Sequence, residues 1–407
     1  MSFTTASGSP TGSIGTLVYL FFSGGVLSAC SSLFLLGVVR SLFLKQLELN
    51  NFRNYHKQVL EPGLFLNILT GQNAQGKTNI LESIYMACIG NSFRTGKEKE
   101  IINWESDFSY IHSLLQTEQR SLQVNIFLKP GFKKIEVNGS LKRGSPLGWP
   151  GVVLFTADDL ALVKGSPFER RRFLDLEVGP FHPQYAHNLA RYQRVLVQRN
   201  NLLREVRQKR EEKSSLQVWD EQLCRYGAKI LYFRLELLKK FTPLLRSLYL
   251  ELAAGVEDFD IRYKSTIKLE GLKSEEEIYN RFQQQLYLMQ ADEIDRAQSL
   301  LGPHRDDLIF FINGRDARIY GSQGQQRTIV LTLKIAQIDL WKEEIDEYPI
   351  LLLDDVIFEL DHDRRQAIFE RIGSLVQTFL TTTKTEDIGF SKELNHKTFT
   401  VSHGNIK

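Results

Sequence analysis

Apolar and polar residues alternate in the first third of the chain in a way that predicts β-strands around one helix. Phe43, Leu47 and Leu49 recur between polar positions and indicate a first strand. The apolar stretch from Leu64 to Leu69 predicts a further strand, and the run from Asn79 to Cys88 has a helix-like pattern. We therefore expect residues 42–128 to form strands with a helix among them.

The middle of the chain has a helical pattern. Between residue 183 and about residue 254, apolar positions recur at helix spacing, as in Leu189, Tyr192, Val195 and Leu196. No long heptad array follows, so an extended coiled coil is not expected. We interpret residues 181–297 as a mainly helical lobe inserted into an α/β unit that comprises residues 42–180 and 298–407.

Further turn and strand signals lie on both sides of this lobe. Ile135 to Leu141 is predicted to be a hairpin because Asn-Gly, at residues 138 and 139, is a preferred two-residue turn. The run from Ile329 to Trp341 is strongly helical, Pro349 to Leu353 has the apolar character of a buried strand, and Thr378 to Leu380 predicts another strand. The pattern as a whole indicates an α/β fold.

A phosphate-binding motif follows the strand predicted at residues 64–69. It fits G-x-x-x-x-G-K-[ST] and consists of Gly71, Gln72, Asn73, Ala74, Gln75, Gly76, Lys77 and Thr78. The two glycines let successive N–H groups point inward at phosphate oxygens, and the following helix offers its N-terminus to the same anion. We expect Lys77 to reach the β- and γ-phosphates of ATP and Thr78 to bind Mg²⁺.

Two carboxylates end the apolar strand at residues 349–353. An unpaired carboxylate at the end of a buried strand costs free energy, and a bound metal ion would offset that cost. Asp354 is therefore predicted to hold Mg²⁺, and Asp355 to polarise the attacking water as a general base. An ordinary strand followed by an acidic turn is the alternative interpretation, which the P-loop in the same chain disfavours.

A second anion-binding helix start precedes the acidic strand. Ser322 is a natural N-cap for the helix that follows, and the small residues around it leave N–H groups free. A capped helix after a turn is the plain alternative. The position just before the carboxylate strand favours a functional interpretation for Ser322, Gln323, Gly324 and Gln325.

The order of P-loop, Ser-x-Gly-Gln motif and acidic strand resembles the ABC-type ATPase heads of the SMC superfamily, and the wording of the motifs is most similar to the RecF family of DNA replication and repair proteins. The resemblance spans nearly the whole chain after residue 41. It is carried by residues 44–55, 71–78, 167–175, 302–307, 321–328 and 351–361.

The resemblance implies roles that residue types alone do not give. Arg53 would contact the nucleotide, the Ser322 motif would meet the γ-phosphate bound by a facing subunit, and Glu359 and Asp361 would lie in the loop that crosses the interface. It implies an ATP-dependent homodimer that binds duplex and gapped DNA in replication and recombinational gap repair (the SOS response), with slow, DNA-stimulated ATP hydrolysis. The implied partners are the RecO and RecR mediators, which help to load recombinase on single-stranded DNA.

The chain departs from the family pattern at Phe358, where members usually carry Ser next to the interface loop. ABC heads also usually have a His after the strand that follows the acidic one, where this chain has the threonine run 381–383, as the RecF group does. The first departure questions the geometry of the interface loop, and the second supports the narrower assignment.

The distribution of charged residues weakly favours nucleic-acid binding. The totals are nearly balanced, 51 Lys+Arg against 48 Asp+Glu, but residues 191–213 hold eight Lys/Arg and three Glu. A solvated helical face and a set of DNA phosphate contacts explain this run equally well. The candidate DNA-binding residues are Arg191, Arg194, Arg199, Arg204, Arg207, Lys209 and Arg210.

The first 41 residues do not fit the rest. Residues 1–39 carry no charged side chain, and residues 16–39 are long and apolar enough to be a membrane-span candidate. Because the resemblance begins near Leu42, we favour an upstream start assigned in error, with a membrane anchor as the alternative. Three widely separated cysteines, Cys30, Cys88 and Cys224, suggest neither a disulfide framework nor a zinc site, so a cytoplasmic protein is expected.

Two other function classes stay open on sequence grounds. A membrane-associated ABC transporter ATPase subunit is suggested by the apolar N-terminus, but the inserted lobe and the single possible span disfavour it. A P-loop small-molecule phosphotransferase is the second alternative, and the helix start at Ser322 disfavours it.

Overall fold

The computed structural model describes residues 41–117, 120–142, 151–253, 255–356, 362–373, 375–383 and 396–407. The expectations for residues 1–40, for Phe358 and for the interface-loop residues Glu359 and Asp361 lie outside the described residues. Among the described residues, none of the helices has both the length and the apolar character needed to span a bilayer.

The first sheet is antiparallel and has the strand order β2-β1-β4-β5-β6-β7. Its strands are β1 (Phe43–Phe52), β2 (Tyr55–Leu60), β4 (Ser109–Gln116), β5 (Ser121–Lys129), β6 (Phe132–Val137) and β7 (Ser140–Leu141). The predicted hairpin is confirmed, because Asn138 and Gly139 both have positive φ between β6 and β7. A bulge between Leu44 and Gln46 interrupts the alternation of β1.

The second sheet is mostly parallel and has the strand order β15-β14-β3-β13-β12-β8. Its strands are β3 (Leu66–Thr70), β8 (Val152–Phe155), β12 (Ile350–Leu353), β13 (Thr378–Thr382), β14 (His396–Ser402) and β15 (Asn405–Ile406). Both faces of β12 are buried, which is why its sequence is continuously apolar. Ile350 and Leu352 join the core shared with the first sheet and with α2 (Lys77–Ile89), whereas Leu351 and Leu353 face the helices.

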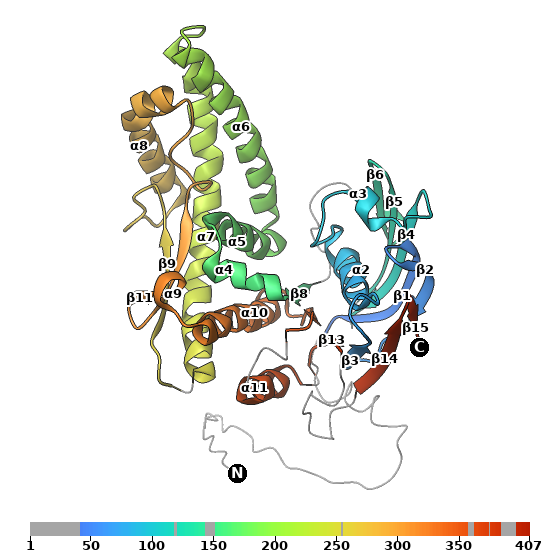
Figure 1. Ribbon diagram of the computed structural model, residues 1–407. Coiled ribbons are helices and arrows are strands. Elements are labelled where there is room, and N and C mark those ends of the chain that lie inside the picture. Colours follow the sequence, from blue (N-terminus) through green and yellow to red (C-terminus); the bar gives the residue numbers. More distant parts are fainter. Residues whose placement is uncertain are drawn as a thin grey trace, which may run out of the picture. The chain divides into compact units, whose positions relative to one another are not determined.

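The helical part is built from α5 (Pro167–Phe181), α6 (Pro183–Arg207), α7 (Leu216–Leu252) and α8 (Glu275–Arg296). Helices α6 and α8 both pack against α7 (Figure 1). The long helical pattern is thus two helices, separated by a turn around the short 3-10 helix η2 (Lys213–Ser215). A small antiparallel sheet, β11-β10-β9, accompanies them and consists of β9 (Phe259–Lys264), β10 (Asp307–Ile312) and β11 (Arg315–Asp316).

Helix α10 (Gln323–Ile345) connects the parallel sheet to the helical part, because it packs against both β8 and α7 (Figure 1). Apolar side chains around most of its circumference are buried, as this position requires. The remaining elements are short or peripheral: α3 (Glu98–Ile101), η1 (Ala157–Leu160), α4 (Ala161–Lys164), α9 (Ala317–Tyr320) and α11 (His362–Ile372).

Candidate nucleotide-binding site

The P-loop joins β3 to α2, as its motif predicts, and two of its positions accept only glycine. Gly71 has φ +156°, and a Cβ there would collide with the carbonyl oxygen of Val401. Gly76 has φ +114° at the N-cap of α2, and a Cβ there would lie 2.6 Å from the Asn54 amide and 2.8 Å from the Tyr55 hydroxyl. The glycines therefore allow other strands to approach the loop closely.

Neighbouring segments hold the loop from outside. The Asn54 amide donates to the Gln75 carbonyl at 2.9 Å, and the Tyr55 hydroxyl donates to the Gly76 carbonyl at 3.0 Å. The backbone N–H of His403 donates to the Gln75 side chain at 2.7 Å. Gln72, Asn73 and Ala74 stay exposed, so this part of the loop is accessible to a ligand. A loop braced in this way loses little conformational entropy when it binds phosphate.

Lys77 lies at the start of α2 with its ammonium turned onto the loop. It donates to the Gly71 carbonyl at 2.7 Å and to the Gln72 carbonyl at 3.0 Å. Burial lowers the pKa of Lys77, and the nearby carboxylates of Asp355 and Asp354 oppose that effect. The Lys77 amine is therefore held against the backbone carbonyls of the P-loop.

The acidic strand end meets the P-loop helix. The Thr78 hydroxyl donates to Asp354 Oδ1 at 3.0 Å, although the two residues are far apart in the sequence. The Thr381 hydroxyl donates to the same oxygen at 2.9 Å and accepts the N–H of Asp355, also at 2.9 Å. Burial, assisted by the negative charge of Asp355, raises the pKa of Asp354.

This pair of oxygen ligands fits Mg²⁺. The Thr78 hydroxyl and the Asp354 carboxylate are hard donors in mutual contact, and Mg²⁺ is commonly held by one or two protein oxygens together with substrate phosphates. No group of three or more His, Cys, Asp or Glu ligands occurs among the residues that the structure describes. The site thus suits a metal ion that shares its coordination with a nucleotide.

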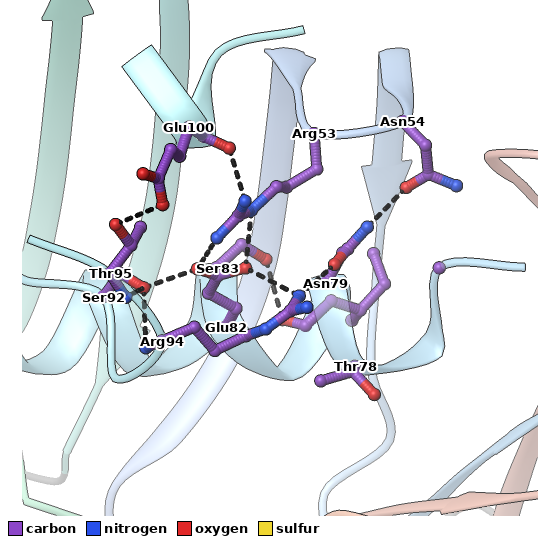
Figure 2. A network of polar contacts seen from close by, with 12 residues as sticks. Arg53, Asn54, Thr78, Asn79, Glu82, Ser83, Ser92, Arg94, Thr95 and Glu100 are labelled. Carbon is purple, nitrogen blue, oxygen red and sulfur yellow. Dashed lines mark hydrogen bonds and ion pairs between the residues drawn. The ribbon is translucent and has the colours of Figure 1, made fainter. Parts of the chain in front are cut away.

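A polar network extends along α2 behind the P-loop (Figure 2). Its centre is Glu82, a fully buried carboxylate one turn after Thr78. Arg53, predicted to contact the nucleotide, donates to both oxygens of Glu82 at 2.9 and 2.6 Å. Arg94 lies 3.5 Å from the same carboxylate and donates to Asn79 at 2.8 Å. The structure shows that Glu82 holds the Arg53 side chain in place, and the contact of Arg53 with the nucleotide remains a prediction.

The network is also connected to the P-loop through Asn54, which Figure 2 shows next to Asn79. Asn79 donates to Asn54 at 2.8 Å, and Asn54 in turn donates to the Gln75 carbonyl. Sequence reasoning missed Glu82, Asn79 and Arg94. The one available signal was the helix spacing that places polar residues 78, 79 and 82 on adjacent turns of α2.

The second predicted anion site has the expected local geometry. Ser322 is the N-cap of α10 and forms a capping box with Gln325, in which the Gln325 N–H donates to the Ser322 hydroxyl at 3.2 Å and the Ser322 N–H donates to the Gln325 side chain at 2.7 Å. Gln325 also donates to Glu257 at 2.8 Å. Ser322, Gln323 and Gly324 are exposed, so this helix start is accessible from outside the chain.

Two of the family-like stretches meet in space. Arg170, from the 167–175 stretch, forms a two-pronged ion pair with Asp307 of the 302–307 stretch at 2.7 and 3.1 Å. Arg234 of α7 joins both stretches, because it contacts Asp175 at 2.7 Å and the Pro303 carbonyl at 2.9 Å. These buried charges are paired, as burial demands, and they connect α5, α7 and β10.

The structure corrects one candidate DNA contact. Arg199 is fully buried and forms ion pairs at 2.6 Å with both Asp220 and Glu293, so its assignment to a DNA-binding set was wrong. Its charge compensates two acids from neighbouring helices instead of facing solvent. The other six candidates are exposed, namely Arg191, Arg194, Arg204, Arg207, Lys209 and Arg210.

Comparison with known proteins gives a consistent answer. The family model described as an AAA domain matches residues 46–301. The DNA replication and repair protein RecF of Pelotomaculum thermopropionicum is 58% identical over 366 residues, which are 90% of this chain and 100% of that protein. RecF of Desulforamulus reducens is 47% identical over 85% of this chain and 93% of its own length.

Solved structures agree. A structure of the recombination mediator protein RecF with ATP has a TM-score of 0.83 and 31% identity, over 91% of this chain and 98% of that one. The Smc head domain of Pyrococcus furiosus bound to part of ScpA has a TM-score of 0.52 at 16% identity over 90% of this chain and 95% of that one, a likeness of fold alone. The chain has the ABC-type ATPase fold and belongs to the RecF family of DNA replication and repair proteins.

Proposed function

We propose that this chain is an ATP-dependent DNA-binding clamp for DNA replication and recombinational gap repair. The observation that carries the proposal is that one chain has two helix starts suited to an anion, the P-loop with α2 and the Ser322 end of α10. The family relationship and the structural likeness to an ATP-bound RecF support it. The transporter and phosphotransferase alternatives have no comparable support.

ATP would bind with its phosphates in the P-loop. Lys77 would exchange the Gly71 and Gln72 carbonyls for phosphate oxygens, because a charged acceptor binds ammonium more strongly than a neutral one. Thr78 and Asp354 would hold Mg²⁺, which when bound neutralises charge on the phosphates. Asp355, whose N–H is fixed by Thr381, would orient and deprotonate the attacking water.

The Ser322 motif would complete the site of a second copy. Ser322, Gln323, Gly324 and Gln325 lie at an exposed helix start whose N–H groups suit the γ-phosphate bound by a facing chain. A head-to-tail pair with two-fold symmetry would then bury two ATP molecules between chains. ATP would favour the closed pair because it binds that state more tightly, and slow hydrolysis would release it.

The clamp is proposed to close on duplex DNA next to gaps, and DNA is proposed to stimulate its weak ATPase. The six exposed cations of the α6 region, given above, support non-specific phosphate contacts. A related structure is described as a recombination mediator in the RecFOR pathway, which supports RecO and RecR as partners. The proposed place of action is the cytoplasm, where ATP and DNA are both available. We also propose the four-part division at residues 41/42, 180/181 and 297/298, although β9 and β10 pair across the last of these boundaries.

Mixing two inactive variants tests the composite site. Lys77→Ala removes the P-loop cation, and Ser322→Arg blocks the second helix start, so each protein alone should lack ATP-dependent dimers and ATPase activity. In a mixed dimer one site has both intact halves. Mixing should restore up to about half of wild-type turnover, since neither variant forms dimers with itself and each mixed dimer has one intact site of two.

The control for this experiment is mixing Lys77→Ala with Asp354→Ala, which both damage the same half of the site and should not complement each other. Full loss of activity in the Lys77→Ala and Ser322→Arg mixture would contradict a site shared between chains. Retained dimerisation by Ser322→Arg alone would do the same.

A further inference from the structure

A cavity of about 350 Å³ lies at the C-terminal end of α2, the end opposite the P-loop. It is enclosed by the loop at residues 91–96, by Lys133 of β6 and by Arg172 of α5. Arg94, the loop residue already described in Figure 2, also lines it. The three cations therefore converge on one space from segments that are far apart in the sequence.

The loop that forms one wall is held in a defined conformation. The Ser92 hydroxyl donates to the buried Glu82 and accepts the N–H groups of Arg94 at 2.9 Å and Thr95 at 3.2 Å. The Thr95 hydroxyl donates to Glu100 at 2.6 Å and accepts the Lys97 N–H at 3.1 Å. The Phe93 ring meets Tyr85 of α2 edge-on, with 5.4 Å between ring centroids. A wall fixed in this way is preorganised for a ligand.

The charges of the cavity are poorly balanced. Lys133 donates to two neutral acceptors, the Gly90 carbonyl and the Asn91 side chain. Arg172 is exposed and has no hydrogen bond or ion pair with any residue that the structure describes. Among the described residues Glu98 is the one acid on the lining, and Arg94 pairs with the buried Glu82, which Arg53 also contacts. Lys133 and Arg172 are thus the two lining cations without an acidic partner among the described residues.

The end of α2 does not oppose an anion here. A helix C-terminus carries partial negative charge, which repels phosphate. Lys133 lies against the carbonyl of Gly90, the C-cap of α2, and compensates that charge. Its ammonium has three protons and two partners, so it retains a donor for a ligand.

We infer that this cavity binds a backbone phosphate of duplex DNA, with Lys133 and Arg172 as its principal contacts. The inference rests on the proposed DNA-binding function and adds a site apart from the α6 cations. It places a DNA contact on the ATPase head, next to the network behind the P-loop. A phosphate fits because lysine and arginine side chains commonly bind phosphate oxygens. The cavity walls also supply hydroxyl and amide groups.

The salt dependence of DNA binding tests the site. The full-length chain is titrated with a blunt duplex of about 30 base pairs with 5′-hydroxyl ends, which carries only phosphodiesters, in the presence of a non-hydrolysable ATP analogue. Each phosphate contact that is lost should reduce the slope of log K against log salt by about 0.9. Between about 50 and 200 mM salt, wild type should therefore lose about 3.5-fold more affinity than Lys133→Gln or Arg172→Gln.

The control is Lys134→Gln, which makes the same charge change on the adjacent residue of β6. Lys134 does not line the cavity and is paired with Glu136 at 2.6 Å. Its slope should match that of wild type. Arg172→Gln removes no hydrogen bond or ion pair in the described part of the chain, so it reports on the site even if Lys133→Gln fails to fold.

The outcomes distinguish the proposed DNA-binding clamp from the proposed phosphate site in the cavity. Wild-type binding with unchanged slopes for both cavity variants would overturn this site and leave the clamp intact. Equal changes of slope in Lys134→Gln and Lys133→Gln would also overturn it, since the loss of any positive charge in this region would then explain the weaker salt dependence. Absence of duplex binding by wild type would overturn the clamp and this site together.

Discussion

Replacing Glu177 by glutamine tests how the buried contact between α5 and α10 depends on pH. The Glu177 carboxyl is buried, and the Gln337 side chain of α10 donates a hydrogen bond to it. Burial is the main cause that raises its pKa from 4.5 to about 7, against the opposing effects of Gln337 and the Lys334 charge. The folded chain therefore favours the neutral acid over the carboxylate.

The sign and size of the effect follow from that pKa. Because the folded-state pKa lies above the unfolded value, the stability from neutral Glu177 is fully present below about pH 4.5 and is lost as pH rises through about 7. A pKa shift of one unit corresponds to about 1.4 kcal/mol of stability. The shift from 4.5 to about 7 therefore lowers the free energy of unfolding at high pH by about 3 kcal/mol at most. Glutamine resembles the neutral acid and should not show it.

Urea unfolding of the wild type and Glu177→Gln between pH 5 and 8 provides the assay. The two free energies of unfolding should be similar near pH 5, and the variant should become more stable by about 1–3 kcal/mol at pH 8. Glu205→Gln, at an exposed position of α6, should show no such divergence. A constant difference between wild type and Glu177→Gln across this range would refute the reasoning.

Three further substitutions test the nucleotide-binding site and helix α6. Gly76→Ala should abolish ATP binding measured by calorimetry, because its Cβ would lie 2.6 Å from Asn54 at a φ of +114°; normal affinity would show that the loop can shift. Asp355→Asn should bind ATP yet accumulate closed dimers in sizing experiments, and rapid turnover would remove Asp355 from the general-base role. Arg199→Gln should lower the free energy of unfolding by about 3–5 kcal/mol by leaving Glu293 buried without its partner, whereas Arg194→Gln should change it by less than about 0.5 kcal/mol; equal effects would contradict the burial assignment.

The motifs that sequence reasoning placed correctly are local ones. The P-loop, the acidic strand end and the cap at Ser322 each depend on a few consecutive residues, so their geometry is fixed by backbone conformation and hydrogen bonds within about one turn. The contact between Thr78 and Asp354 brings together the two residues predicted from sequence as Mg²⁺ ligands, because parallel strands place their carboxyl ends at one edge.

The contacts that were missed are non-local. Thr381 reaches Asp354 because β13 pairs beside β12, and a threonine run in the sequence does not reveal that register. Arg199 has the spacing of a solvated helix face, yet its partner Glu293 comes from α8 and buries it. Likewise β9 pairs with β10 across a boundary at which periodicity predicted a change of unit. Packing decided each of these cases.

Sedimentation of the full-length chain, with and without ATP and Mg²⁺ and with and without duplex DNA, tests the central proposal most directly. The clamp predicts a monomer without nucleotide, a dimer with ATP and Mg²⁺, and DNA bound in preference by the dimer. A monomer under all conditions that ignores DNA would contradict the clamp and leave an ATPase head of another purpose.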